Sequence, residues 1–254
     1  MLMQYLICAI AVFVYMSMFW AVSQKINKIA IIDIAWAFGF SLITVISIVL
    51  NFPPNGAIWI ISIPVFIWSL RLGTYVFIRN KGKPEDWRYE EIKSKWDNPK
   101  LSSFFGVFMF QGVLMLFIAY PIIINNLLKP VTLGILSYIG IIVWISGFIF
   151  ESIADYQLRK FVKTKKPGQI MKMGLWKYSR HPNYFGESVM WVGISLIGFS
   201  SSGDIIVFGS PILLTFLLLF VSGVPYIERR YESNKEFQNY KKKTSMFFPL
   251  PPKK

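Results

Sequence analysis

Cysteine and histidine are almost absent from this chain, and charged residues are scarce. The 254 residues include one Cys, one His and 16% charged residues, whereas 54% are hydrophobic. A single Cys excludes an internal disulfide and a Cys-rich metal site. A single His excludes the usual zinc-binding helices, so we expect no metal centre. Because a soluble domain carries about a quarter charged residues, the composition points to a chain that lies mostly in a bilayer.

Long apolar runs account for the hydrophobic excess. About 20 apolar residues match the roughly 30 Å hydrocarbon core of a bilayer. Alternating segments of a membrane β-barrel are missing, so helices must satisfy the backbone hydrogen bonds. The predicted fold is an all-α, polytopic membrane bundle of about seven helices in one domain over 1–254. The predicted spans are 2–23, 29–50, 57–78, 104–125, 131–154, 184–199 and 205–227.

The placement of the basic residues orients these spans. Lys and Arg number 27 against 13 Asp and Glu, a net charge of +14 that in a soluble protein would suggest nucleic acid. Here 25 of the 27 cations fall in alternate loops and the C-terminal tail. The positive-inside rule then predicts an outside N-terminus and a cytoplasmic C-terminus. We therefore expect membrane lipids as partners and no nucleic acid. The absence of a targeting sequence and the compact length favour a bacterial inner membrane.

Few ionisable or amide side chains lie within the spans, and such residues usually mark function. At about 1.5 Å per residue they all fall in the cytoplasmic half of the bundle. One interpretation is a single polar cavity open to the cytosol. The alternative is that Asp33 and Arg71 neutralise each other, while the two glutamates cap helices or reach the surface. These residues are Asp33, Arg71, Gln111, Glu151 and Glu187.

The stretch YSRHPNYFGE, residues 178–187, concentrates polar chemistry at the start of the sixth span. Pro182 suits the first turn of a helix, with His181 or a neighbour as cap. A well-made helix start would explain Pro182 but not the whole set. Helical spacing could bring several side chains to one face at the positive end of the helix, where a phosphate or carboxylate would bind. These residues are Arg180, Asn183, Tyr184 and Glu187.

Three segments resemble a known family of membrane enzymes. GLWKYSRHPNYFGE is similar to the C-terminal signature of the steroid 5α-reductase superfamily, in its bacterial branch. DYQLRKFVKTKKPGQI and the closing EFQNYKKKTSMFFPLPP resemble other parts of that signature, and RNKGKPEDWRY at 79–89 resembles the family's cytoplasmic loop. The likeness is specific over roughly 150–254 and looser before that.

The resemblance implies an NADPH-dependent reduction of a polarised carbon–carbon double bond in a lipid-like substrate. It assigns 1–125 to the substrate side and 126–254 to the cofactor side. The eight cations of the loop 155–183 agree with a 2′-phosphate ligand. Matched by position, and together with the polar helix start, the expected cofactor-binding residues are Arg79, Asn80, Lys83, Asp155, Arg159, Lys165, Arg180, His181, Asn183, Tyr184, Glu187 and Arg229.

The sequence departs from the family at the position of its catalytic tyrosine. Family members of the steroid type use a Tyr in the third span and an acidic residue in the second to polarise the enone oxygen. Trp68, three residues before Arg71, stands at the Tyr position. We therefore predict Asp33 as the acidic group, Tyr75 as the substitute donor and Arg71 as their partner.

A second family shares part of the signature. RHPNY at 180–184 also resembles the motif of isoprenylcysteine carboxyl methyltransferases and phospholipid methyltransferases, which bind S-adenosylmethionine. That resemblance implies a membrane methyltransferase with S-adenosylmethionine in place of NADPH. The NYFGE pattern and the upstream Lys-Pro-Gly run favour the reductase.

Overall fold

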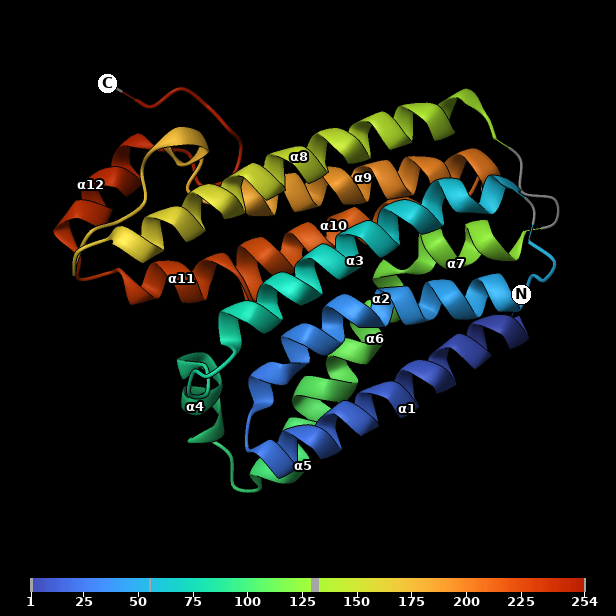
Figure 1. Cartoon of the computed structure of the whole chain (residues 1–254), viewed down its shortest axis with the longest axis horizontal. Coiled ribbons are helices and arrows are strands. Elements are labelled where there is room, and N and C mark those ends of the chain that lie inside the picture. Colours follow the sequence, from blue (N-terminus) through green and yellow to red (C-terminus); the bar gives the residue numbers. More distant parts are fainter. Residues whose placement is uncertain (1, 55, 129–132, 254) are drawn as a thin grey trace. The chain divides into compact units, whose positions relative to one another are not determined.

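The computed structural model describes residues 2–54, 56–128 and 133–253, and these form helices joined by turns (Figure 1). Within these ranges, extended backbone pairing is limited to one isolated β-bridge between Ser179 and Ser245. The all-α prediction is therefore confirmed. The helices are α1 Leu2–Ile26, α2 Ile32–Val49, α3 Trp59–Asn80, α4 Trp87–Lys93, α5 Pro99–Ser103, α6 Phe110–Ile118, α7 Tyr120–Leu127, α8 Ile135–Thr164, α9 Pro182–Ser202, α10 Gly209–Phe216, α11 Val224–Arg230 and α12 Lys235–Lys243.

The chain divides into two compact units. Unit 1 comprises Met1–Tyr138 and Leu196–Ser210, and unit 2 comprises Ile139–Ser195 and Pro211–Lys254. Each unit is described below by itself. The assignment of 1–125 to substrate and 126–254 to cofactor stays a prediction.

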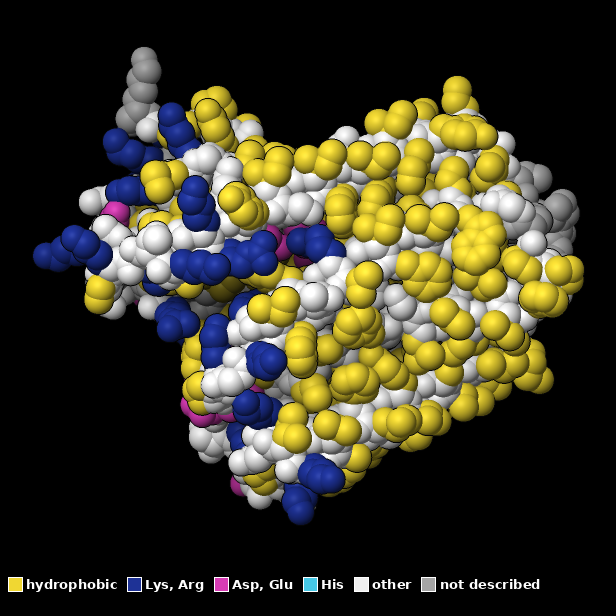
Figure 2. Space-filling view, in the orientation of Figure 1, with side chains coloured by type: hydrophobic (Ala, Val, Ile, Leu, Met, Phe, Trp, Pro, Cys, Tyr) yellow, Lys and Arg dark blue, Asp and Glu magenta, His cyan; other side chains and the backbone are white. Residues whose placement is uncertain are grey.

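Six helical segments in the described ranges are long and apolar enough to cross a membrane. Large apolar side chains lie exposed along them, and Figure 2 shows hydrophobic side chains over much of the visible surface. These features indicate an integral, multi-pass membrane protein. The run 184–199 does form a helix, α9, but Asn183, Glu187 and its serines lower its hydropathy, so it is not among the six. The six are Leu2–Ile26, Ile29–Val49, Gly56–Asn80, Pro99–Ile118, Ile135–Thr164 and Ile205–Arg230.

In unit 1, α2 is the central helix. It packs against α1, α3, α6 and α7. Its buried face consists largely of small or apolar residues, including Ala35, Gly39, Phe40 and Ile43. Gly39 lets the Met115 side chain come close, since a Cβ there would lie 2.4 Å from the Met115 sulfur. The acidic Asp33 lies in the first turn of this helix.

The fourth predicted span, 104–125, is wrong at its C-terminal end. The membrane-length segment ends at Ile118, and α7 starts as a separate helix at Tyr120. Pro121 has no N–H to donate and its ring excludes the preceding turn, so the helix cannot continue through it. Asn126 of α7 then donates to the hydroxyls of Ser47 and Ser62, at 3.0 and 3.2 Å, in the core of unit 1.

In unit 2, α8 and α9 approach backbone to backbone. A Cβ at Gly147 would lie 2.6 Å from the Gly186 carbonyl oxygen, and one at Gly186 would lie 2.6 Å from the Glu151 nitrogen. Gly193 meets the α8 backbone at Trp144 in the same way. Small residues at this spacing allow helices to pack closely in a membrane. This contact fixes the first turns of α9 against α8.

The helix α8 runs ten residues beyond its predicted end at 154 and closes at Thr164. The segment 155–164 contains neither Pro nor Gly, so the helix continues after the apolar stretch has ended. Asp155 and Arg159 therefore lie on a helix that projects past the apolar part of unit 2, and not in a loop.

Candidate functional site

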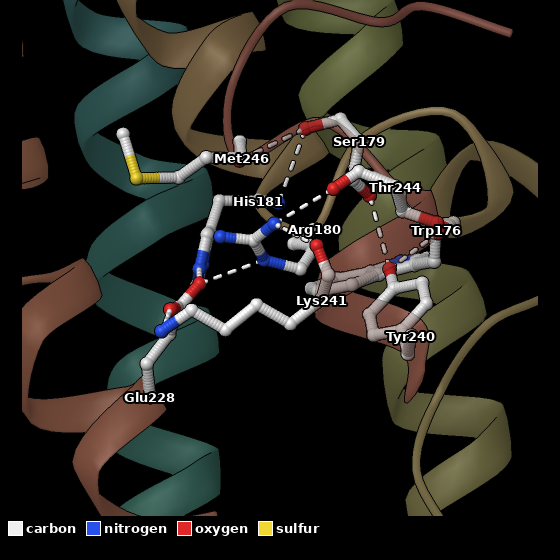
Figure 3. A network of polar contacts seen from close by, with 9 residues as sticks. All are labelled: Trp176, Ser179, Arg180, His181, Glu228, Tyr240, Lys241, Thr244 and Met246. Carbon is white, nitrogen blue, oxygen red and sulfur yellow. Dashed lines mark hydrogen bonds and ion pairs between the residues drawn. The ribbon is translucent and has the colours of Figure 1, made fainter. Parts of the chain in front are cut away.

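Arg180 holds the C-terminal tail in place within unit 2. Arg180 lies ahead of the first residue of α9, and its side chain is buried (Figure 3). Its Nε donates to Glu228 Oε1 at 2.8 Å, and its Nη1 donates to the carbonyl oxygens of Thr244 at 2.7 Å and Lys241 at 3.2 Å. The helical spacing predicted for 180, 183, 184 and 187 therefore holds only for the last three.

Glu228 is the negatively charged residue at the centre of these contacts. We call the nine residues of Figure 3 the tail network: Trp176, Ser179, Arg180, His181, Glu228, Tyr240, Lys241, Thr244 and Met246. The Glu228 carboxylate faces Arg180, the Lys241 ammonium at 3.0 Å and His181 Nε2 at 3.3 Å. Buried charges are stable only when they are paired and hydrogen-bonded. The Arg180 and Lys241 cations around one carboxylate, together with the carbonyl oxygens that accept from Arg180 Nη1, meet that condition.

Backbone contacts complete the tail network. The Arg180 amide donates to the Ser245 carbonyl oxygen at 2.8 Å, and the Leu250 amide donates to the Tyr178 carbonyl oxygen at 3.0 Å. The Tyr240 hydroxyl donates to the Trp176 carbonyl oxygen, and burial raises the pKa of Tyr240, so the hydroxyl remains a donor. The tail after α12 is thus held against the segment that leads into α9.

His181 is buried in the tail network and stacks on Tyr184 with ring centroids 5.5 Å apart. Burial lowers the pKa of His181, partly opposed by the Glu228 carboxylate. Neutral imidazole can donate its single N–H to Glu228. The neighbouring charges are Glu228, Arg180 and Lys241.

The lowered pKa predicts that acid destabilises the fold through His181. Below the ordinary histidine pKa of about 6.5, His181 binds a proton in the unfolded chain but stays neutral in the folded chain. The free energy of unfolding therefore falls as the pH decreases below about 6.5. We expect the Tm of the wild type to fall more steeply than that of His181→Asn between about pH 6.5 and 5. Thermal unfolding of both proteins over pH 5–8 measures this, and parallel curves would contradict it.

The first turns of α9 present a second group of polar side chains in unit 2. Asn183 and Tyr184 are half-buried, and Glu187 and Asp155 are buried. The Asn183 Oδ1 atom is inaccessible to solvent and accepts no hydrogen bond from the described residues. Most buried acceptors in folded proteins are hydrogen-bonded, so this one is an exception.

Unit 1 contains a separate charged cluster at the start of α2. Asp33 Oδ2 faces the guanidinium groups of Arg79 and Arg88, each at 3.5 Å, and Asp33 Oδ1 accepts from the Tyr89 hydroxyl at 3.2 Å. Arg88 also binds Asp86 with two hydrogen bonds at 3.0 and 2.9 Å. Two carboxylates and two guanidinium groups therefore hold the loop after α3 against α2.

Tyr89 is a buried hydrogen-bond donor within this cluster. Burial and the nearby Asp33 carboxylate raise the pKa of Tyr89, so its hydroxyl keeps its proton at neutral pH. Gln111 of α6 interacts with the same hydroxyl, which joins two of the residues predicted to share a cavity. Glu151 and Glu187 belong to unit 2, so the single cavity for all five residues stays a prediction, as does the pairing of Asp33 with Arg71.

The predicted catalytic residues of α3, Arg71 and Tyr75, lie between Asp33 and Arg79 in sequence. The Arg79 guanidinium lies 5.9 Å from the Tyr75 ring centroid, which links Tyr75 to Asp33 through one cation. Trp68 is buried and packs edge-on against Phe40 at 5.4 Å. The residue at the family Tyr position is therefore part of the core of unit 1.

The loop 79–89 is also held in place by Glu85 and Lys28, two residues that the sequence did not single out. Glu85 accepts from the backbone amides of Ile29 and Ala30, in the 3-10 turn that leads into α2. Arg79 Nε donates to Asn80 Oδ1 at 3.2 Å, and the Lys83 carbonyl oxygen accepts from Lys28. Acidic residues at helix starts favour such capping, but only the fold shows which helix Glu85 caps.

The remaining predicted cations are exposed. Arg159 and Lys165 lie at the end of α8, and the Arg229 guanidinium lies over the Tyr226 ring at 5.5 Å. Sequence patterns did not indicate Glu228 and Lys241 in unit 2 or Arg88 and Tyr89 in unit 1. A lone acidic residue in the apolar and basic stretch VPYIERRY was the available signal for Glu228.

These features define an all-helical, multi-pass membrane protein with a cluster of paired charges in each unit. The chain belongs to the family described as "Protein of unknown function (DUF1295)", whose model matches residues 19–244. That match begins far ahead of the motifs at 150–254. The predicted resemblance to the steroid 5α-reductases is confirmed by the relatives below.

Curated relatives are similar over part of their length. An uncharacterised protein of Schizosaccharomyces pombe is 25% identical over 210 residues, covering 72% of this chain and 60% of that protein. The mouse 3-oxo-5-alpha-steroid 4-dehydrogenase 1 is 31% identical over 112 residues (44% of this chain, 41% of the relative), and the human protein of the same name is 30% identical over 113 residues (44% and 40%). The chain thus spans less than two thirds of each of these relatives. No solved structure matches it significantly.

Proposed function

We propose that this protein is a membrane-embedded, NADPH-dependent reductase of a polarised carbon–carbon double bond in a lipid-like substrate. The similarity to 3-oxo-5-alpha-steroid 4-dehydrogenases supports this class of reaction. The observation that supports a bound cofactor is the buried Asn183 Oδ1, an acceptor without a donor among the described residues. The carboxamide N–H of a nicotinamide is a donor of the required chemistry.

The polar residues of unit 2 have the chemistry that NADPH requires. Asn183, Tyr184 and Glu187 offer amide, hydroxyl and carboxylate groups in the first two turns of α9. Exposed cations for the phosphates come from Arg159, Lys165 and Arg229, and Asp155 is a further polar contact. Guanidinium and ammonium groups bind phosphate by charge-assisted hydrogen bonds.

Arg180 and His181 would position the cofactor-binding residues without contacting the cofactor themselves. Their side chains contact Glu228 and the tail, so they hold the segment that leads into α9. Preorganised binding groups lose less conformational freedom when the ligand arrives. The tail network would keep Asn183 and Tyr184 in place.

The cluster in unit 1 supplies the groups proposed to polarise the substrate. NADPH, when bound, would provide the hydride for the electron-poor carbon of the double bond. Asp33 would order the hydrogen-bond donors, with Tyr75 and Arg71 as the residues we propose to contact the substrate oxygen. Tyr89 joins them as a protonated hydroxyl on Asp33. Donors aimed at a developing oxyanion stabilise the transition state.

Ligand binding to detergent-purified protein tests the proposal. Calorimetric titrations would compare NADPH, NADH, S-adenosylmethionine and S-adenosylhomocysteine at one salt concentration. We expect saturable NADPH binding and weaker NADH binding, because a 2′-phosphate gains contacts from the cations. Asn183→Ala should raise the Kd for NADPH roughly 5- to 10-fold, the effect of one lost hydrogen bond.

Gln238→Ala, an amide removed from α12 of the same unit, is the control and should leave the Kd unchanged. Thermal unfolding of each variant would show that both are folded. Saturable binding of S-adenosylmethionine with no binding of NADPH would overturn the reductase and identify a membrane methyltransferase.

A further inference from the structure

A basic pocket opens in unit 2 beside the tail network. It has a volume of about 360 Å³ and lies between the segment before α9, the helix α12 and the tail. Three lysines line it, together with one glutamate, the half-buried Tyr240 and the buried Thr244. The charged residues are Lys172, Lys177, Lys243 and Glu236.

The charges of this pocket do not balance. Lys172 pairs with Glu236 at 2.5 Å, which leaves Lys177 and Lys243 as an excess of two positive charges. The Lys177 ammonium lies 5.8 Å from the Tyr178 ring centroid. A hollow with excess ammonium groups favours an anion, and each ammonium offers three donors to phosphate oxygens.

Exposed apolar side chains border the lysines in the same part of unit 2. Met173 follows Lys172 and Tyr178 follows Lys177, with 63% and 41% of their surface exposed. Leu250, 55% exposed, is tied to Tyr178 by its backbone amide, and Phe248 is 62% exposed. All four lie outside the six membrane-length segments.

Apolar side chains next to lysines characterise segments that lie at a membrane surface, with the apolar groups among the acyl chains and the cations at the headgroups. A soluble anion would gain nothing from Met173, Tyr178, Leu250 and Phe248. Figure 2 shows the Lys and Arg side chains gathered over this end of unit 2, with hydrophobic side chains between them.

We propose that this pocket binds the phosphate of an anionic phospholipid, with Lys177 and Lys243 holding the phosphate and the apolar border contacting the lipid chains. The bound lipid would fasten the tail and the segment before α9 to the membrane surface. The site is separate from Asn183 and does not depend on the cofactor.

The test compares two charge-matched double variants of the whole detergent-purified protein. Lys177→Gln with Lys243→Gln removes the excess charge of the pocket and leaves the pair of Lys172 with Glu236 intact. Lys235→Gln with Lys242→Gln removes the same charge from α12 outside the pocket. The probes are dioctanoyl-phosphatidylglycerol, dioctanoyl-phosphatidylcholine, inorganic phosphate and NADPH, each titrated by calorimetry and thermal shift.

We expect saturable binding of dioctanoyl-phosphatidylglycerol to the wild type and weaker binding of the phosphatidylcholine. The pocket variant should raise the Kd for the anionic lipid on the order of 30-fold, at about 1 kcal/mol for each lysine near the surface. The α12 control should change it much less. NADPH affinity should be the same in both variants.

Three outcomes would overturn the lipid site. Equal loss of affinity in the two double variants would show only a general charge effect. Binding of inorganic phosphate as tight as that of the lipid, with the same dependence on the pocket, would identify a site for free phosphate. A loss of NADPH affinity in the pocket variant alone would assign the lysines to the cofactor. Lys177→Gln alone repeats the comparison if the double variant does not fold.

Discussion

Replacing Arg180 with Met is expected to lower the Tm by roughly 6–20 °C, the shift that corresponds to about 3–5 kcal/mol in a chain of this size. The substitution leaves Glu228 buried with one fewer positive partner. It also removes the donor to the Thr244 and Lys241 carbonyl oxygens. The cost comes mainly from these uncompensated groups and not from the lost attraction alone.

Arg230→Met is the matched control, because it removes an exposed guanidinium from α11. It should shift the Tm by no more than a few degrees. Limited proteolysis adds a second measurement: cleavage after α12 should be faster in Arg180→Met than in the control. Equal melting and equal cleavage in both variants would show that Arg180 does not anchor the tail.

Adding one methyl group at Gly186 is expected to destabilise unit 2. The new Cβ would lie 2.6 Å from the Glu151 nitrogen and 2.9 Å from its Cα, and backbone atoms cannot rotate away as a side chain does. The helices α8 and α9 must therefore move apart. We expect Gly186→Ala to cost about 1–3 kcal/mol, or roughly 2–12 °C in Tm.

Gly106→Ala gives the opposite expectation for the same chemical change. Open space surrounds Gly106, so its methyl group meets no atom within 4 Å. Because Ala favours helical backbone over Gly by about 1 kcal/mol, the Tm should stay constant or rise. Thermal unfolding in one detergent compares the two variants, and a similar change in both would exclude close packing as the cause.

The helix start at Pro182 illustrates what local sequence can predict. A ring with fixed φ and no N–H suits the first helical position, whatever lies around it, and α9 begins there. The break before α7 also follows from a proline, Pro121, yet the apolar run continues through it and hid the boundary. Hydropathy reports the environment of a segment, and helix ends depend on backbone chemistry.

The role of Arg180 could not be predicted in the same way. Its partner Glu228 is 48 residues away in sequence, and the carbonyl oxygens it binds are more than 60 residues away. Backbone carbonyl groups carry no residue-specific signal. Tyr89 meets Asp33 across a comparable separation, 56 residues, so the spacing of polar residues within one helix says nothing about that contact.

The sequence by itself determined the membrane class, the helical fold and the family, because composition, run length and motif are local properties that the bilayer and the backbone act on directly. Only the tertiary structure decided which charges meet. It set Arg180 and Lys241 around Glu228, and Arg79 and Arg88 around Asp33, because such pairs form where helices distant in sequence pack together and buried charges must find partners.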